Sequence, residues 1–152
     1  MLAYAFHYDV HVSWLGKRQM FDGPLAGIFR RLGGIAVERA KSGNMVDRMA
    51  GLFETRDRLC LIVPAEGSRG YVEYWKSGFY HIARAADVPV VASFLDYPKK
   101  QGGFGPSIPI TGNISTDMDK FRDFYGEMKG KYPEKTGRIR LKEEDAPQVA
   151  TA

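Results

Sequence analysis

The sequence predicts an α/β fold in which a central, mostly parallel sheet is flanked by helices. Segments with the pattern of strands alternate along the chain with segments whose apolar residues recur at helical spacing. The short apolar run at 59–63 is typical of a buried strand. The chain has 152 residues, 44% of them hydrophobic and 26% charged, which is the length and composition of one globular domain.

The first half of the chain predicts helices and strands in alternation. The expected elements are the end of a helix at 1–6, a strand at 10–14, a loop at 17–23, a helix at 24–32, a strand at 35–37 and a helix from about Asn44. Pro24 suits a first helical turn, because its missing N–H would have no helical partner there. Gly33 and Gly34 are expected to end the helix that Pro24 begins.

The second half continues the alternation. The expected elements are a strand at 59–63, a helix from about Lys76, a strand at 88–97, a turn at 98–103, an edge strand at 108–110 and a last helix. Pro109 would place its strand at an edge, since proline donates no ladder hydrogen bond. Ser115 or Thr116 is the expected cap of the last helix. Residues 1–130 form the predicted domain, and the polar tail at 131–152 is expected to fray.

One short segment has the clearest chemical character, Glu66, Gly67, Ser68 and Arg69. It follows the strand expected at 59–63, so its side chains should project from a strand end, where α/β proteins often place ligand-binding groups. An arginine and a hydroxyl beside backbone N–H groups suit an oxyanion such as phosphate. A glycine in this loop would let a ligand approach the backbone closely.

The charge balance favours an anionic partner. The net charge of +4 and the pI of about 9.2 suit a phospholipid surface, a phosphorylated substrate or nucleic acid, although a basic surface that is merely solvated would give the same balance. Nucleic acid is disfavoured because the basic residues are scattered and no recognition motif accompanies them. Two pairs could face anionic lipid headgroups, Arg30-Arg31 and Lys99-Lys100.

Several features are absent from the sequence, and their absence bears on the expected location of the protein and on metal binding. No apolar run approaches the roughly 20 residues of a membrane span, and the start lacks the features of a secretory signal. The single Cys60 allows no internal disulfide and is expected to be an inert buried thiol. No Cys/His cluster has metal-ligand spacing. We therefore expect a cytoplasmic protein without a metal, either free or in peripheral contact with the cytoplasmic membrane face.

Four blocks, taken in order, resemble the motifs of the glycerolipid acyltransferase superfamily, which includes lysophosphatidic acid and glycerol-3-phosphate acyltransferases. The blocks are Lys17 with Pro24-Leu25-Ala26-Gly27 and Gly33-Gly34-Ile35-Ala36-Val37-Glu38-Arg39, then Glu66-Gly67-Ser68-Arg69, then Lys76-Ser77-Gly78 with Ala83, and finally Val88-Pro89-Val90-Val91. Their order and spacing follow those of the family. Two departures are Ala65, where the family usually has proline, and Gly70, which replaces a common serine.

The resemblance implies a glycerol-3-phosphate acyltransferase-like fold and an activity in phospholipid biosynthesis. A fatty acyl group would pass from acyl-CoA or acyl-carrier protein to a lysophospholipid-type hydroxyl. The resemblance assigns Arg39 and Arg69 to the phosphate of a phosphorylated lipid acceptor. Glu66 would accept a hydrogen bond from the acceptor or hold Arg69 in place. Ser68 would donate a hydrogen bond, and Lys76 would add positive charge or remain a solvated helix residue. No cofactor is implied, because the acyl carrier is a co-substrate.

The family's catalytic motif, His-x-x-x-x-Asp, is absent from this sequence. In the family the histidine acts as general base on the acceptor hydroxyl, whose oxygen attacks the acyl thioester, and the aspartate orients the imidazole. The residues five places after His7, His11 and His81 are valine, glycine and alanine. We therefore expect no catalytic residue within the chain. His7 and Asp9 are a weak alternative pair, and His81 is expected to be a packing or surface residue.

The simplest interpretation is that the sequence begins late, so that the first elements of the fold and the His/Asp pair would precede Met1. Such a chain would expose an unpaired strand edge and apolar surface, and we expect it to aggregate or oligomerise. The alternative is a non-catalytic module that binds a phosphorylated lipid or another anion through Arg39 and Arg69.

Overall fold

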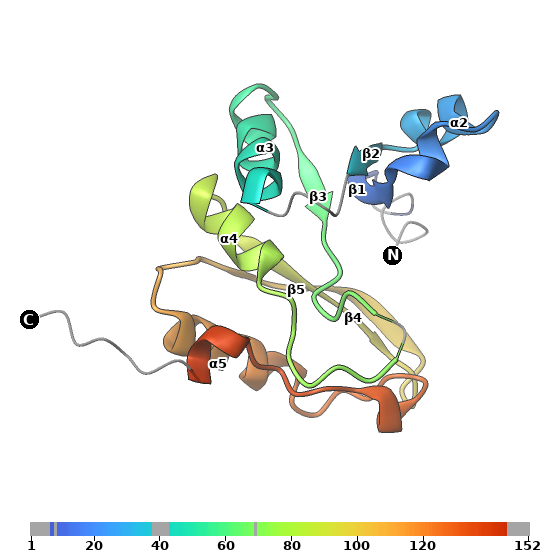
Figure 1. Cartoon of the computed structure of the whole chain (residues 1–152). Coiled ribbons are helices and arrows are strands. Elements are labelled where there is room, and N and C mark those ends of the chain that lie inside the picture. The colour runs from blue at the N-terminus through green and yellow to red at the C-terminus, as the bar shows by residue number, and fades with distance from the viewer. Residues whose placement is uncertain (1–6, 8, 38–42, 69, 146–152) are drawn as a thin grey trace, which may run out of the picture.

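The computed structural model describes residue 7 and residues 9–37, 43–68 and 70–145 (Figure 1). In order, the elements are β1 (Val12–Lys17), the 3₁₀ helix η1 (Arg18–Phe21), α2 (Ala26–Arg31), β2 (Gly34–Val37), α3 (Gly43–Glu54), β3 (Cys60–Ile62), α4 (Gly78–Ala85), β4 (Val90–Asp96), β5 (Gln101–Ile108), α5 (Ile114–Tyr125), η2 (Pro133–Lys135) and η3 (Lys142–Asp145). The predicted α/β class is confirmed. The helix end predicted at 1–6 lies outside the described residues. Within the described part, no helix combines the length and the apolar character that a membrane crossing requires.

Three strands form a parallel sheet in the order β2-β1-β3. In the middle strand, Trp14 is aligned with Gly34 of β2 and with Ile62 of β3. Because the strands are parallel, the carboxyl ends of β2 and β3 lie at the same edge of the sheet. Val37 ends β2 and Ile62 ends β3. The segment after β2 and the segment after β3 therefore both start at this edge of the sheet. The sequence predicts that both segments bind phosphate.

The strand expected at 88–97 is present as β4, but it does not join the parallel sheet. It pairs antiparallel with β5 in a separate two-stranded sheet. Two smaller sheets thus replace the single central sheet that the sequence predicts. The predicted edge strand at 108–110 is wrong as well, since β5 covers Gln101–Ile108. Three glycines between 102 and 105 remove the side-chain alternation that identifies a strand, and pairing with β4 supplies the strand conformation instead.

The helix α2 ends where the sequence predicts. Gly33 has a φ of 81°, in the left-handed region that favours glycine, and a Cβ there would lie 2.1 Å from the Val12 carbonyl oxygen. Phe29 packs against the rings of Trp14 and Phe21, with centroid distances of 6.2 and 6.1 Å. Since α2 itself contributes no buried residue, this aromatic cluster is what holds the helix against the sheet.

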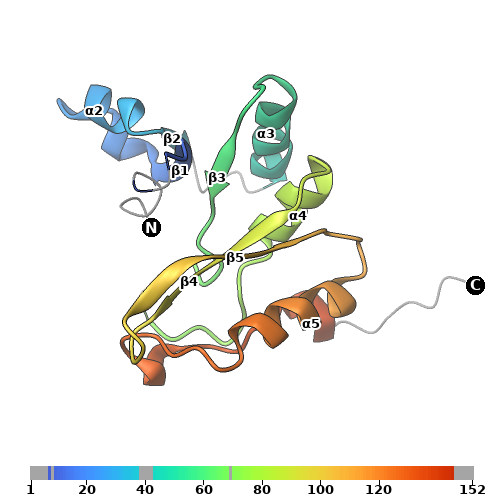
Figure 2. The ribbon, with the colours of Figure 1, turned by 180° about the vertical axis from the view of Figure 1, so that it is seen from behind.

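The helix α4 joins two hydrophobic clusters of the described residues. Ile82 packs with Val37 and Met49 between the parallel sheet and α3. On the same helix, Phe79 and Tyr80 pack with the β4–β5 hairpin and α5. Figures 1 and 2 show α4 between these two parts, with α2 and α5 at opposite ends of the molecule. Burial on two faces of one helix therefore ties the two sheets into one folded unit.

The last helix begins earlier than predicted. Its cap is Asn113, whose side-chain oxygen accepts a hydrogen bond from the Thr116 N–H at 3.2 Å. The expected caps, Ser115 and Thr116, lie inside α5 instead. Asparagine and serine cap about equally well, so the residue types alone do not choose between them. The extended backbone conformation of Asn113, with φ −85° and ψ 95°, makes Asn113 the cap of α5.

Asp117 is a fully buried carboxylate that fixes α5 to the loop before it. It accepts hydrogen bonds from the Thr111 N–H and hydroxyl at 2.8 and 2.9 Å, and from the Gly112 N–H at 3.2 Å. The Tyr80 hydroxyl donates at 3.0 Å, and Lys120 Nζ lies 3.3 Å away. Burial acts to raise the pKa of Asp117, but these hydrogen bonds together lower it. Burial and the bond to Asp117 raise the pKa of Tyr80 to about 12.

Acid should remove the stabilisation that Asp117 provides. Its pKa is lower in the folded chain than in the unfolded one, so its contribution is complete above the unfolded value of about 4 and is lost as pH falls through the folded value. Thermal unfolding of the wild type and of Asp117→Asn, followed by circular dichroism across this range, measures the effect. We expect the advantage of the wild type to shrink below about pH 4. An advantage that stays constant from neutral pH down through this range would contradict the expectation.

The segment at 131–145 belongs to the fold, whereas the sequence predicts a frayed tail. Leu141 is fully buried in the cluster formed by α4, the hairpin and α5. Its neighbour Arg140 accepts a backbone hydrogen bond from the Trp75 N–H at 2.9 Å. The prediction rested on the polarity of the segment, and it is wrong here because one leucine and a few backbone bonds are sufficient to hold the segment in place. The rest of the predicted tail, 146–152, lies outside the described residues.

Candidate functional site

Glu66 and Ser68 lie in the loop that follows β3, where the sequence places them. Glu66 is half-buried, and Ser68 is exposed. Between them, Gly67 has a φ of 64°, which a side chain would strain. A Cβ at this position would also lie 3.0 Å from Lys76 Cγ. The Lys76 N–H donates to the Ala65 carbonyl at 2.7 Å, so the loop packs directly on the chain that leads into α4.

A small cavity opens between this loop and the segment that follows α5. We call it the loop pocket. Its volume is about 200 Å³, which is room for several water molecules of roughly 30 Å³ each or for one phosphate group. Pockets that enclose a whole drug-sized ligand measure roughly 300–1,000 Å³, so this one suits a headgroup. It is lined by Glu66, Ser68, Gly130, Lys131, Tyr132, Lys135 and Thr136.

Two lysines give the loop pocket its positive charge. The 3₁₀ turn of η2, closed by the hydrogen bond from the Lys135 N–H to the Tyr132 carbonyl at 3.0 Å, sets their spacing. The Nζ atoms of Lys131 and Lys135 lie 5.4 and 4.7 Å from the centroid of the Tyr132 ring, within the range of cation–π attraction. Glu66 is the single carboxylate among the described residues that line the pocket. The pocket therefore favours an anion.

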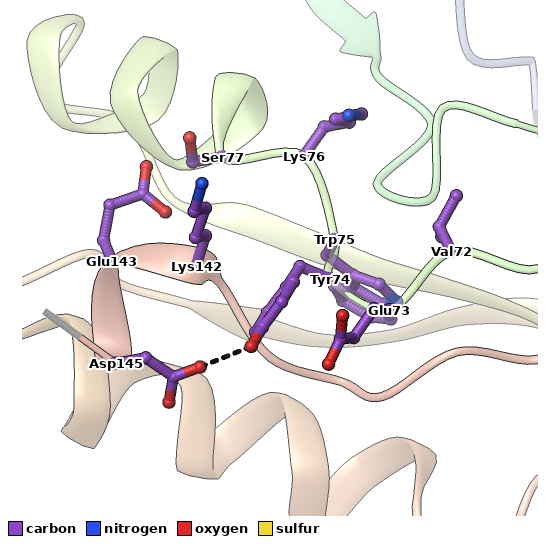
Figure 3. A pocket seen from close by; sticks show the side chains of 9 residues that line it. All are labelled: Val72, Glu73, Tyr74, Trp75, Lys76, Ser77, Lys142, Glu143 and Asp145. Atoms are coloured by element: carbon purple, nitrogen blue, oxygen red, sulfur yellow. Dashed lines mark hydrogen bonds between the residues drawn. The ribbon is translucent and has the colours of Figure 1, made fainter.

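A larger, open groove of about 850 Å³ carries the opposite balance of charge (Figure 3). Three carboxylates line it, from Glu73, Glu143 and Asp145, against the ammonium groups of Lys76 and Lys142. Figure 3 shows Lys76 pointing away from Glu143 and Asp145. This acidic lining repels a phosphate, so of the two hollows the loop pocket is the better oxyanion site. The remaining residues that line the groove are Val72, Tyr74, Trp75 and Ser77.

Two of the three carboxylates that line the groove are engaged in structural contacts. The Tyr74 hydroxyl donates to Asp145 at 2.7 Å, and this bond lowers the pKa of Asp145 and raises that of Tyr74. Burial acts to raise the pKa of Glu143, but the neighbouring Ser77 hydroxyl and His81 ring lower it overall. His81 Nε2 lies 3.4 Å from Glu143 Oε1. This contact ties η3 to the half-buried His81 of α4, and the assignment of His81 as a packing or surface residue stays a prediction.

The structure brings together some of the predicted site residues and leaves others untested. Glu66 and Ser68 line one pocket, and Gly67 shapes their loop without lining it. Lys76 is exposed and supports that loop. Arg39 and Arg69, the predicted phosphate ligands, lie outside the described residues, so their role stays a prediction.

Sequence reasoning missed the second wall of the pocket. Lys131, Lys135 and Thr136 fall in the segment that the sequence assigns to a polar tail. Their local pattern offered a signal, since two lysines four residues apart flank an aromatic residue and a turn-forming Pro133. That pattern indicates a local turn, but it does not indicate which distant loop the turn will face.

No histidine is found among the described residues that line the loop pocket. His7 and Asp9 precede β1, which begins at Val12, so they do not share a strand face. The described residues also include no group of three or more His, Cys, Asp or Glu that could hold a metal ion. Cys60 is half-buried in β3, and burial raises the pKa of its thiol, which keeps it protonated and unreactive.

The chain matches no protein-family model, no characterised protein and no solved structure. The resemblance to glycerolipid acyltransferases therefore stays a prediction based on four blocks of sequence. The case for a function depends on the chemistry of the loop pocket.

Proposed function

We propose that the chain is the phosphate-binding part of a glycerolipid-type O-acyltransferase with a glycerol-3-phosphate acyltransferase-like fold. Its loop pocket holds the phosphate of a lysophospholipid-type acceptor, and acyl-CoA or acyl-carrier protein is the acyl donor. One observation carries the proposal. Glu66 and Ser68, which belong to the acyltransferase-like block, line the same cavity as Lys131 and Lys135.

Each group in the loop pocket has a role that follows from its chemistry. The ammonium groups of Lys131 and Lys135 neutralise the phosphate. The Ser68 hydroxyl accepts a hydrogen bond from the Gly70 N–H at 3.1 Å and retains its own proton for a phosphate oxygen. The Glu66 carboxylate repels phosphate but accepts a hydrogen bond from a free hydroxyl of the acceptor. Together these groups orient a phosphorylated headgroup with its phosphate toward the lysines.

In the proposed reaction the acceptor hydroxyl loses its proton to a base while its oxygen attacks the thioester carbonyl, and the thiol of the donor leaves. The described residues of the loop pocket supply binding and orientation for this reaction but include no histidine to act as the base. This observation, with the absence of His-x-x-x-x-Asp from the sequence, favours a second candidate function. It is a non-catalytic module that binds a phosphorylated lipid or another anion.

Calorimetric titration with glycerol 3-phosphate tests phosphate binding. We expect glycerol 3-phosphate to bind and glycerol, which lacks the phosphate, not to bind. The double variant Lys131→Gln/Lys135→Gln should weaken binding by on the order of tenfold, since each exposed lysine contributes up to about 1 kcal/mol. Arg69→Ala should weaken it by about tenfold to a hundredfold, as the loss of a charge-assisted bond predicts.

Lys129→Gln is the matched control for this titration. It removes the same charge from an exposed neighbour that does not line the pocket, so affinity should stay within about twofold of the wild type. Equal binding of glycerol and glycerol 3-phosphate would refute the proposal. So would an equal loss in the control and the double variant, because the effect would then come from net charge.

An acyl-transfer assay with acyl-CoA and a lysophosphatidate tests whether the chain is catalytic by itself. We expect phosphate binding without detectable turnover, because a positioned imidazole contributes about 10²–10⁴-fold and the pocket lacks one. Turnover that Arg69→Ala abolishes would show that the chain is a complete enzyme and would exclude the non-catalytic module.

A further inference from the structure

We propose that the exposed side of α2 docks onto a membrane surface that contains anionic lipids. The docking face consists of the apolar side chains of Met20, Leu25, Ile28 and Leu32 together with the basic residues around them. The inference does not rest on the proposed function, because the docking face shares no residue with the loop pocket.

The apolar residues of the docking face form one stripe. Leu25, Ile28 and Leu32 are spaced by three and four residues, which places them on the same side of a helix. Backbone hydrogen bonds from Phe29 N to Leu25 O and from Leu32 N to Ile28 O, at 3.1 and 3.0 Å, extend the helical geometry to both ends of the stripe. Their exposed fractions are 54%, 55% and 43%, and the adjoining Met20 is 40% exposed.

The fold does not use this stripe. The inner side of α2 is occupied by Phe29, which packs on Trp14 and Phe21, and a hydrogen bond from Trp14 Nε1 to the Leu32 carbonyl at 2.9 Å holds the end of the helix. The stripe is therefore free of a structural role within the described chain while it exposes large aliphatic side chains side by side. Contiguous apolar patches of this kind mark interaction surfaces more often than isolated exposed leucines do.

The charged residues near the stripe indicate what binds the docking face. Between residues 10 and 37 the basic side chains are Lys17, Arg18, Arg30 and Arg31, and Asp22 is the single acidic one. Arg31 follows Ile28 by three residues and therefore borders the stripe. Arg30, in contrast, is two residues from both Ile28 and Leu32 and lies on the other side of the helix. A basic residue that borders an apolar helix face is typical of helices that lie in the interface of an anionic bilayer. A second copy of the chain is a poor occupant, because two surfaces of the same positive charge repel each other.

The docking face also has a suitable position. In both views α2 projects at one end of the molecule, at the opposite end from α5 (Figures 1 and 2). A projecting helix can reach a flat surface without contact between the bilayer and the rest of the fold. The stripe then enters the headgroup region with the helix axis along the surface, and Arg31 contacts lipid phosphates.

Co-sedimentation with sucrose-loaded vesicles tests the inference. One set contains phosphatidylcholine alone, and the other contains about one third phosphatidylglycerol, an anionic lipid without a phosphate monoester. We expect the full 152-residue chain to bind the anionic vesicles at least tenfold more tightly than the neutral ones. Raising the salt to about 1 M, where the Debye length falls to roughly 3 Å, should remove most of this difference.

Substitutions separate the apolar from the basic contribution. Arg31→Gln should weaken binding to the anionic vesicles by roughly fivefold, and Ile28→Ser should weaken it by about tenfold. Val91→Ser, at a 50% exposed position on β4, is the control and should stay within about twofold. Circular dichroism melts check that each variant folds.

Three outcomes would overturn the inference. They are equal binding to both vesicle sets, Ile28→Ser binding as tightly as the wild type, and an equal loss in Val91→Ser. Sedimentation velocity without vesicles tests the other occupant, since a dimer that Ile28→Ser abolishes would assign the face to a second copy. The variant Lys131→Gln/Lys135→Gln should keep its vesicle binding, so failure of the phosphate site and failure of the docking face are distinguishable.

Discussion

Replacement of Asp117 by alanine is expected to destabilise the fold by about 3–5 kcal/mol. The carboxylate is fully buried and receives hydrogen bonds from two backbone N–H groups, of Thr111 and Gly112, and from two hydroxyls. Alanine removes the partner of all four donors. The Tyr80 hydroxyl, on a fully buried residue, then has no partner and no water to replace it, at a cost of about 1–3 kcal/mol. Thr111 is exposed and Gly112 is half-buried, so their donors regain part of the loss from water. Urea unfolding followed by circular dichroism measures the loss of unfolding free energy.

Asp119→Ala is the matched control, two residues further along α5. The Asp119 side chain is 64% exposed and pairs with Arg122 at 2.8 Å, so its loss should cost about 0–1 kcal/mol. Equal effects at the two positions would show that Asp117 does not have the buried role described above. If Asp117→Ala is too unstable to purify, Thr111→Val removes one hydroxyl donor and should cost about 1.5–3 kcal/mol. A cost within 0.5 kcal/mol, the range of ordinary surface changes, would also contradict the prediction.

Leu141→Ala is expected to cost about 2–5 kcal/mol, the range for a buried leucine whose side chain leaves a cavity. Leu141 is 0% exposed and packs with residues of α4, the hairpin and α5. It also anchors the segment that carries Lys131 and Lys135, so a lower affinity for glycerol 3-phosphate should accompany the loss of stability. Denaturant unfolding and calorimetric titration of the same variant measure the two effects.

The control for this substitution is Leu95→Ala. Leu95 lies on β4 and is 43% exposed, so the same truncation there should change the unfolding free energy by no more than about 0.5 kcal/mol. A change as small in Leu141→Ala would mean that the segment at 131–145 is the frayed tail that its composition suggests. In that case the second wall of the loop pocket would be lost together with the proposal that depends on it.

Local signals in the sequence located the elements well in the first two thirds of the chain. The helix that stops at Gly33 and the helix that begins near Asn44 follow from apolar spacing and from glycine, both of which act within one or two turns. The strand at 101–108 was missed because its glycines show no alternation. Only its antiparallel register with β4, a contact between two segments, makes it a strand.

The candidate site likewise contains residues that the sequence predicts and residues that only the tertiary structure reveals. Glu66 and Ser68 were predictable because the end of a short apolar strand and a turn-forming proline announce a loop of exposed polar groups. Lys131 and Lys135 were not, because their place in the pocket depends on the path of the chain after α5 and on the burial of Leu141. Both are consequences of packing between distant segments.

By itself, the sequence determined the α/β class, the order of most elements, the polar loop after β3 and the absence of a His-x-x-x-x-Asp motif. These properties are set by residue type and by spacing over a few residues. The tertiary structure alone decided that the strands form two sheets, that a polar segment closes a cationic pocket around Glu66 and Ser68, and that the apolar stripe of α2 faces outward. Each of these depends on which surfaces meet when the chain folds, and surfaces that meet across many tens of residues leave no local pattern in the sequence.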